Sequence, residues 1–368
     1  MLNKLTDRLL KKEWSEEMIN QLVGEYHNLY HAYAEDPAVR TNAASGGVGS
    51  ALLIELLKAG EITGALVCNT SVEAGKVRAH FSIACSEQEI LEAQGSKYVE
   101  TAFMKEALPL IRDFDGTVAV VGLPCDITNL SRWIAKDTQL ASKVRLKIAL
   151  VCGHNSRTEL IDGITKKLEN QAGGNLQSYR FRRGHWRGQL EASFDNHSTI
   201  KKPFSYFSLY QNLFFFSEKK CLVCNDHFGY HADISLGDVW AFRFKDDPIK
   251  KTGVIVRTEV GETFWNSASQ QQINAVPLEV TDILDGQARS APYHNNVSAR
   301  SRVASLFGYK IPDKAKYPVT WHQWITALMS LSNMHWSESK RYQGLIFKLP
   351  RPILKFYLYI RKGLESLK

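Results

Sequence analysis

The spacing of apolar and polar residues in the first half of the chain alternates between helical and extended patterns. Residues 1–35 repeat apolar side chains near helical spacing, which predicts an amphipathic N-terminal helix. Residues 51–69 fit a helix followed by a glycine stop and a buried strand. Two further apolar runs, 117–122 and 145–151, each predict a short buried strand. Strands that alternate with helices favour an α/β domain with a parallel or mixed sheet.

The pattern changes from about residue 176 onward. Residues 178–207 alternate as antiparallel hairpin strands do, and 209–216 fit either a helix or a buried strand. Short strands follow within 252–280, and the pattern is helical again after about residue 298. We therefore expect a mixed α/β (α+β) fold. It has an N-terminal α/β part with a mixed sheet, a strand-rich part and an appended C-terminal helical region.

The composition is that of an ordinary globular protein. The chain has 368 residues, of which 44% are hydrophobic and 23% charged. The N-terminus lacks the uninterrupted apolar core of a signal peptide. No run approaches the ~20 apolar residues of a membrane-spanning helix. These features predict a cytoplasmic protein.

The net charge of +8 suits a nucleic acid, a membrane surface or an acidic protein as partner. The basic residues are spread out and accompany neither a zinc-finger helix nor an RNA-binding aromatic signature, so we expect no nucleic acid partner. In residues 350–368, Lys355, Arg361 and Lys362 flank apolar side chains. This segment either packs on the protein body as a helix or makes a peripheral contact with an anionic membrane surface.

Four of the six cysteines have positions that suit a metal centre. In a reducing compartment, cysteines serve as core residues, metal ligands or nucleophiles. Cys125 and Cys152 each follow a predicted strand, and the carboxyl ends of parallel strands share one edge, where ligand sites gather. Cys221 and Cys224 form a C-x-x-C in a glycine-bearing loop. Together the four can complete a Cys₄ site for zinc or for an iron–sulfur cluster.

Spacing alone leaves other assignments of the cysteines open. Cys68 and Cys85 lie in strand-like runs and fit small buried hydrophobic residues. Cys125 and Cys152, which follow the predicted strands, also fit ordinary core residues. His227 and His231 follow the C-x-x-C and are alternative zinc ligands in place of those two, although the separation is far too short for a zinc finger.

Two glycine-bearing loops are candidates for binding a phosphate or pyrophosphate. Small residues in 42–57 precede a helix and expose backbone N–H groups at its positive end. Residues 94–100 form a small-residue turn with a lysine for a phosphate and a tyrosine for a ring. Neither loop is a P-loop or a G-x-G-x-x-G motif. The structural alternative for the first loop is a helix N-cap by Ser45, and that for the second is a surface turn.

Read together, six segments of the chain resemble the beta-subunit family of coenzyme F420 hydrogenases and dehydrogenases. The most specific is 221–240, which is similar to the family's C-x-x-C and A-D-I-x-x-G-D-x-W signature. The resemblance covers about 40–285. The segments are SGGVGSALL (45–53), QGSKYV (94–99), GLPCDI (122–127), LVCGHN (150–155), YRFRRGHWRG (179–188) and CLVCNDHFGYHADISLGDVW (221–240).

The resemblance implies FAD and one 4Fe–4S cluster as cofactors. It implies Cys125, Cys152, Cys221 and Cys224 as the cluster ligands. A second set of residues would line the flavin, and a third would shape the loop between cluster and flavin. These sets are Ser45, Gly46, Gly47, Gly95, Ser96, Lys97 and Tyr98 for the flavin, and Asp233, Gly237 and Asp238 for the loop.

The sequence pattern and the resemblance together divide the chain into four parts. Residues 1–40 would form an N-terminal helical segment and 41–120 an FAD-binding part. Residues 121–297 would form an iron–sulfur and flavin part, and 298–368 a basic helical extension.

The implied function is an oxidoreductase that moves electrons between a one-electron carrier and a small organic two-electron substrate. Residues 1–41 lack the cysteines of the ferredoxin-like segment found in many family members, so the electrons would come from a separate acidic carrier such as a ferredoxin. His154, beside Cys152, is the candidate general acid. The alternatives are a zinc-stabilised binding module and an electron-transfer subunit of a larger complex without a substrate of its own.

Overall fold

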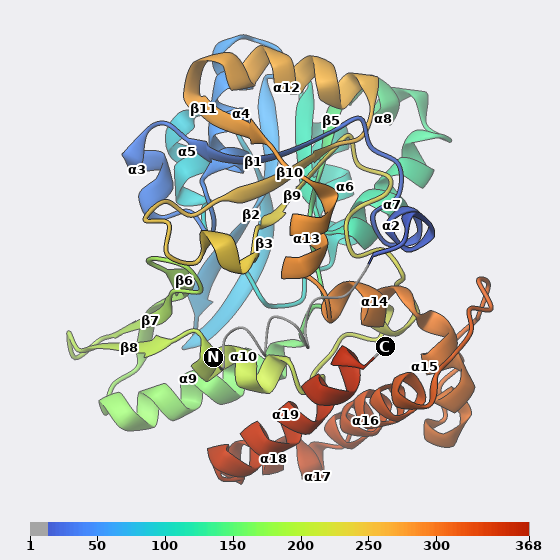
Figure 1. Ribbon diagram of the computed structural model, residues 1–368. Coiled ribbons are helices and arrows are strands. Elements are labelled where there is room, and N and C mark those ends of the chain that lie inside the picture. Colours follow the sequence, from blue (N-terminus) through green and yellow to red (C-terminus); the bar gives the residue numbers. More distant parts are fainter. Residues whose placement is uncertain (1–13, 368) are drawn as a thin grey trace.

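A mixed eight-stranded sheet forms the centre of the computed structural model, which describes residues 14–367 (Figure 1). The strand order is β11-β1-β10-β9-β5-β4-β2-β3, and the four neighbours β9, β5, β4 and β2 are parallel. The strands are β1 (Asn28–Ala34), β2 (Gly64–Glu73), β3 (Lys76–Ala84), β4 (Val118–Gly122), β5 (Val144–Leu150), β9 (Ile234–Asp238), β10 (Thr252–Val256) and β11 (Ile273–Pro277).

Helices cover both faces of this sheet, which explains why its parallel strands are apolar without alternation. In β2, Ala65 and Val67 pack into the core on one face, while Leu66 between them packs into the core on the other. The helices on the first face are α4 (Val48–Lys58) and α12 (Glu259–Gln272), and those on the second are α6 (Phe103–Asp113), α7 (Pro124–Ile134) and α8 (Thr138–Lys143).

A second, smaller sheet contains three antiparallel strands in the order β6-β7-β8, as the hairpin pattern predicts (Figure 1). Its core includes side chains from two helices and from the C-terminus of the chain. The elements are β6 (Leu176–Arg183), β7 (Gln189–Phe194), β8 (Thr199–Pro203), α9 (Thr158–Ala172) and α10 (Ser205–Gln211).

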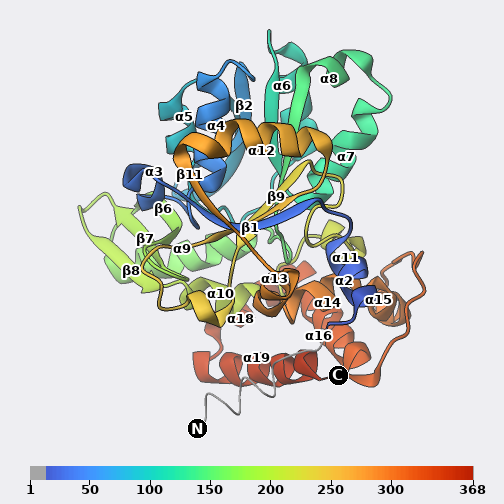
Figure 2. The same cartoon turned by 45° about the horizontal axis from the view of Figure 1, so that its top comes forward.

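The C-terminal region is helical and lies at one end of the molecule, below the second sheet in both views (Figures 1 and 2). Its helices are α15 (Val297–Ala304), η2 (Ser305–Phe307), α16 (Trp321–Glu338), α17 (Lys340–Gln343), α18 (Leu345–Lys348) and α19 (Arg351–Ser366). The other short elements are α2 (Glu16–Val23), α3 (Pro37–Thr41), α5 (Glu87–Glu92), α11 (Lys220–Val223), η1 (Phe242–Phe244), α13 (Val280–Gly286) and α14 (Ser290–Asn295). None of the helices within residues 14–367 is both long and apolar enough to cross a membrane.

The prediction of one N-terminal helix over 1–35 is wrong for its C-terminal part. Among residues 14–35, only α2 is helical, and residues 28–34 form β1, which pairs with β10 on one side and β11 on the other. Its segment NLYHAYA contains two tyrosines, a residue type that suits a strand, and Leu29, Ala32 and Ala34 are buried. Residues 1–13 of the predicted helix lie outside the described residues.

The predicted fold class is confirmed: a mixed sheet, a strand-rich part and a helical C-terminus are all present. The limits of the four predicted parts stay a prediction. The strand β1 from the first part, three strands of the second and four of the third share one sheet.

Candidate functional site

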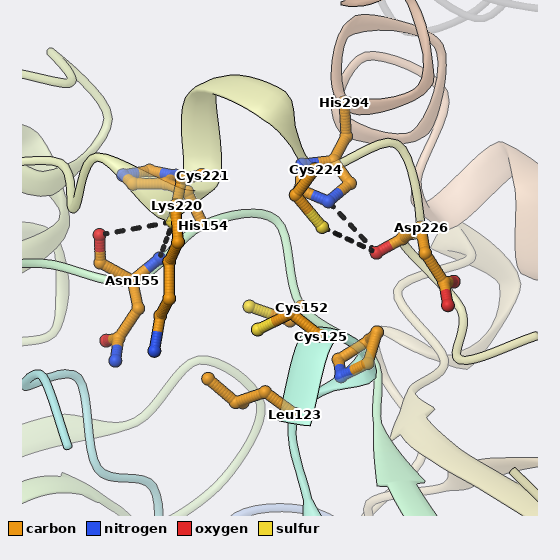
Figure 3. Close-up of a pocket in the computed structure, with 11 residues that line it drawn as sticks. Leu123, Cys125, Cys152, His154, Asn155, Lys220, Cys221, Cys224, Asp226 and His294 are labelled. Atoms are coloured by element: carbon orange, nitrogen blue, oxygen red, sulfur yellow. Dashed lines mark hydrogen bonds between the residues drawn. The ribbon is translucent and has the colours of Figure 1, made fainter. Parts of the chain in front are cut away.

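The four predicted ligand cysteines line one pocket, although they come from three places in the chain. Cys125 and Cys152 follow the carboxyl ends of β4 and β5, which are parallel neighbours. Cys221 lies in α11 and Cys224 ends that short helix. Figure 3 shows Cys125 and Cys152 side by side beneath the loop that carries the other two. None of the four forms a disulfide.

Burial governs the chemistry of these thiols. It raises the pKa of all four, that of Cys221 to about 12. Lys220 opposes the increase in the pKa of Cys125, and the backbone N–H of Asn155 donates to the Cys221 sulfur over 3.4 Å. Because metals bind the thiolate, a metal group bound here has to displace these protons.

The thiols are not arranged around a single ion. Among residues 14–367, no group of three or more His, Cys, Asp or Glu side chains could hold one metal ion. A zinc ion would bring all four sulfurs to about 2.3 Å from one point. A 4Fe–4S cluster takes each cysteine on a different iron and leaves the sulfurs farther apart. Four cysteine thiols in one pocket match the donor set of either group.

The histidines near the cysteines have other partners. His227 Nδ1 lies 2.9 Å from the carbonyl oxygen of Cys152, and burial lowers the pKa of this imidazole to about 4. His231 is exposed and outside the pocket. His294, which is not among the residues predicted from the sequence, lines the pocket, and its Nε2 lies 3.0 Å from the carbonyl oxygen of Asp226. The alternative zinc site with His227 and His231 as ligands has no support in this geometry.

His154 also lines the pocket, but its surroundings suit a structural role. Its Nε2 lies 3.0 Å from the carbonyl oxygen of Gln211, and its ring stacks on Phe214 with centroids 3.9 Å apart. Burial, followed by the nearby Arg361, lowers the pKa of this imidazole to about 4. The low pKa favours the neutral ring, and its Nε2–H is donated to this carbonyl oxygen; the role as general acid stays a prediction.

A cavity with a volume of about 500 Å³ opens next to the cysteine pocket. Its size is in the range of cavities that bind cofactors and other small molecules. It lies at the carboxyl ends of β4, β5 and β9 and reaches the N-terminus of α4. Eight of the ten predicted flavin and loop residues line it, namely Ser45, Gly47, Gly95, Ser96, Lys97, Tyr98, Gly237 and Asp238.

Gly46 does not line the cavity, unlike its neighbours Ser45 and Gly47, and its assignment to the flavin stays a prediction. Its N–H donates to the hydroxyl of Thr252 over 2.9 Å. A Cβ at this position would lie 2.6 Å from the carbonyl oxygen of Ala32 and 2.9 Å from that of Lys250. Glycine is required here because the loop packs against the backbone of β1 and the residues before β10.

Asp233 is also outside the cavity, and its assignment to the cluster–flavin loop stays a prediction. It precedes β9, whereas Gly237 and Asp238 lie at the opposite end of that strand. Its carboxylate accepts from the backbone N–H of Lys147 over 2.8 Å and from the hydroxyl of Thr258 over 2.9 Å. It therefore ties β9 to β5 and to the start of α12.

Lys97 lines the cavity but has its ammonium group turned toward the backbone. The Nζ atom donates to the carbonyl oxygens of Ala93, Gln94 and Gly95, which follow α5. Burial lowers the pKa of this lysine to about 8. The side chain fixes the loop that forms one wall of the cavity.

Arg182 and Trp240 contribute to the cavity wall, although neither is among the cluster, flavin or loop residues predicted from the sequence. The Arg182 guanidinium donates to the Asp238 carboxylate over 2.6 Å and lies over the Trp240 ring, 5.1 Å from its centroid. Trp186 meets the same ring edge-on. A sequence signal existed, because Arg182, Trp186 and Trp240 all lie in the two longest family segments.

The pocket and the cavity share a wall. Leu123, Cys152, His154 and Asn155 line both.

Comparison with known families explains this arrangement. Residues 29–109 match the N-terminal model, and residues 115–281 the C-terminal model, of the beta subunit of coenzyme F420 hydrogenase/dehydrogenase. The chain belongs to this family. Both matches together include the four cysteines and the predicted flavin residues, while residues 282–368 lie outside them.

Individual relatives are distant. The beta subunit of coenzyme F420 hydrogenase from Methanosarcina barkeri is 25% identical over 67% of this chain and 80% of its own length. That of Methanococcus voltae is 24% identical over 71% and 86%. An uncharacterized protein of Methanocaldococcus jannaschii is 28% identical over 62% of this chain and 59% of its own length.

The fold is also shared with a solved structure. A chain of the F420-reducing NiFe hydrogenase complex from Methanosarcina barkeri superposes with a TM-score of 0.61. The superposition covers 83% of this chain and 100% of that chain, at 20% sequence identity. At this identity the likeness establishes the fold alone.

Proposed function

We propose that this chain is an FAD- and 4Fe–4S-dependent oxidoreductase that moves electrons between a one-electron carrier and a small organic two-electron substrate. The wall shared by the cysteine pocket and the large cavity carries the proposal. The family description, which names hydrogenases and dehydrogenases, supports the oxidoreductase class. The cytoplasmic location stays a prediction.

Cys125, Cys152, Cys221 and Cys224 would hold the cluster, because these four free thiols line one pocket. Arg300 would stabilise the loop around Cys224. Its guanidinium donates to the carbonyl oxygens of Leu222 and Cys224, which keeps the C-x-x-C segment in place.

The cavity residues fit a flavin dinucleotide. The N-terminus of α4, with Gly47 in a left-handed conformation just before it, presents the positive end of a helix dipole to an anion. FAD, when bound, supplies two-electron chemistry while also exchanging single electrons with a cluster. The chain's own residues orient the group: Lys97 fixes the loop 93–98, and Arg182 with Asp238 closes the wall toward the small sheet.

Electrons would enter at the C-x-x-C loop. Val223 lies between the two cysteines of this loop and has 45% of its surface exposed, so the loop reaches the protein surface. Lys219 is exposed beside it but is paired with Glu338 over 3.1 Å, so the net charge of +8, rather than this side chain, suits an acidic carrier such as a ferredoxin. The relatives named as hydrogenase subunits support a second partner for the same surface, another subunit of a complex.

The test is a cofactor analysis of protein purified without oxygen. We expect about four irons, about four acid-labile sulfides and about one non-covalent FAD per chain. Stoichiometric zinc without iron would contradict the proposal and favour a zinc-stabilised binding module. Iron without flavin, even after reconstitution with FAD, would contradict the two-electron step and favour an electron-transfer subunit.

A further inference from the structure

Helix α19 exposes an apolar face that nothing in the described chain covers. Ile353, Phe356, Tyr359 and Ile360 have exposed fractions of 56%, 68%, 66% and 46%. Their spacing places them on one side of the helix. Scattered exposed apolar residues are ordinary, but a contiguous patch on one helix marks an interaction surface.

The opposite face of α19 fixes the helix in this orientation. Leu354 and Leu358 are buried in the core of the small sheet. Arg361 is buried as well, with its guanidinium 3.9 Å from the ring centroid of Phe214 and hydrogen-bonded to Glu365 over 2.8 Å. The helix therefore cannot hide its apolar side by rotating.

Much of the positive charge of the chain is located in the same region. Residues 339–368 contain eight lysines and arginines but one acidic residue, Glu365, in a protein whose net charge is +8. Lys348 and Lys355 form no ion pair with any carboxylate of the described residues. The apolar face is thus bordered by cations that no carboxylate within residues 14–367 neutralises.

A neighbouring helix also exposes tryptophans. Helix α16, which packs against α19 at the same end of the molecule, exposes Trp321, Trp324 and Trp336 (Figures 1 and 2). Tryptophan, apolar side chains and unpaired lysines together are typical of surfaces that sit at the boundary between lipid headgroups and acyl chains.

We propose that the outer face of α19 docks the protein on an anionic lipid bilayer. The helix lies in the plane of the interface, with Ile353, Phe356 and Ile360 inserted among the acyl chains. Lys348 and Lys355 contact the anionic headgroups. Positive charge attracts acidic proteins too, but the combination with a broad apolar and aromatic face favours lipid over an acidic electron carrier.

Co-sedimentation with lipid vesicles tests this docking. We expect the full-length protein to bind vesicles of phosphatidylcholine mixed with phosphatidylglycerol, and to bind pure phosphatidylcholine much more weakly. The double variant Ile353→Ser with Phe356→Ser should weaken binding by at least about tenfold, because two inserted apolar groups are lost. Phe242→Ser is the matched control, since Phe242 is 70% exposed outside this face, and it should bind as the unmodified protein does.

The charge is tested separately. Lys355→Glu should weaken binding and reduce its dependence on salt, whereas Lys105→Glu, at an exposed lysine on α6, should change neither. Thermal unfolding should be unchanged in all variants because the altered side chains are exposed. The proposal is overturned if the unmodified protein ignores anionic vesicles, or if the double variant binds them equally well. It is also overturned if the unmodified protein binds no vesicles but co-purifies with a second protein that the double variant no longer binds. In that case α19 is a protein interface.

Discussion

Arg182 in β6 donates a hydrogen bond of 2.6 Å to Asp238 at the end of β9, and this ion pair joins the small sheet to the large one. The Arg182 side chain is only 3% exposed. The same guanidinium contacts the backbone of the β6–β7 loop through the carbonyl oxygens of Trp186 and Arg187. The pair therefore determines how two parts of the cavity wall meet.

We expect Asp238→Asn to destabilise the protein by about 3 kcal/mol, because it leaves a buried guanidinium without its carboxylate. Urea unfolding of the cofactor-free protein measures this free energy. The matched control is Asp282→Asn, which breaks the exposed Arg243–Asp282 pair and should cost no more than about 1 kcal/mol. Equal losses of unfolding free energy in the two variants would show that the Arg182–Asp238 pair stabilises the fold no more than an exposed pair does.

Cys224→Ser should remove or destabilise the cluster, since it takes away one of four converging thiolates. Iron and sulfide content after anaerobic purification, together with the absorbance of the brown chromophore, provide the measurement. Cys68→Ser is the control, because Cys68 is partly buried like Cys224 but lines the cavity instead of the cysteine pocket. Iron loss in the Cys68 variant would refute the choice of ligands.

Ser96→Trp should lower FAD occupancy by filling part of the cavity that Ser96 lines. Flavin released on denaturation, divided by protein concentration, gives the occupancy. The same substitution at the exposed Ser142 on α8 should leave occupancy unchanged. Full occupancy in the Ser96 variant would mean that the flavin binds elsewhere.

Gly46→Val should act on folding, in contrast to the direct loss of flavin expected from the sequence. The added side chain would collide with the carbonyl oxygens of Ala32 and Lys250, and these belong to backbone that cannot move aside easily. We expect a loss of about 3 kcal/mol or more in unfolding free energy, measured without cofactor. If the variant keeps its unfolding free energy but loses flavin, Gly46 contributes directly to the flavin site.

Val223→Glu should slow reduction of the protein by an acidic carrier by about tenfold, through charge repulsion at the exposed C-x-x-C loop. Stopped-flow absorbance with reduced ferredoxin measures the rate, and iron content confirms that the cluster is intact. Leu306→Glu introduces the same charge at an exposed leucine elsewhere and should leave the rate unchanged. Equal rates in all three proteins would place electron entry elsewhere.

Features that depend on local spacing could be predicted from the amino-acid sequence. Continuous apolar runs predicted three of the four parallel strands, β2, β4 and β5, but not β9. The residues after two of these strands, with one C-x-x-C, predicted all four cysteines that share a pocket. This worked because parallel strands bring their carboxyl ends to one edge, so position relative to a strand already implies proximity. The amphipathic pattern of 350–368 likewise predicted α19.

Features that depend on contacts between distant segments became visible only in three dimensions. Asp233 and Asp238 are close in sequence, yet β9 separates them, so one holds the sheet together and the other lines the cavity. Segment 28–34 is a strand because β10 and β11, more than 200 residues later, supply its hydrogen-bond partners. Gly46 faces β1 for the same reason. The periodicity of apolar residues indicates which side of a helix or strand is buried. Which other element covers that side depends on packing between segments that are distant in the sequence.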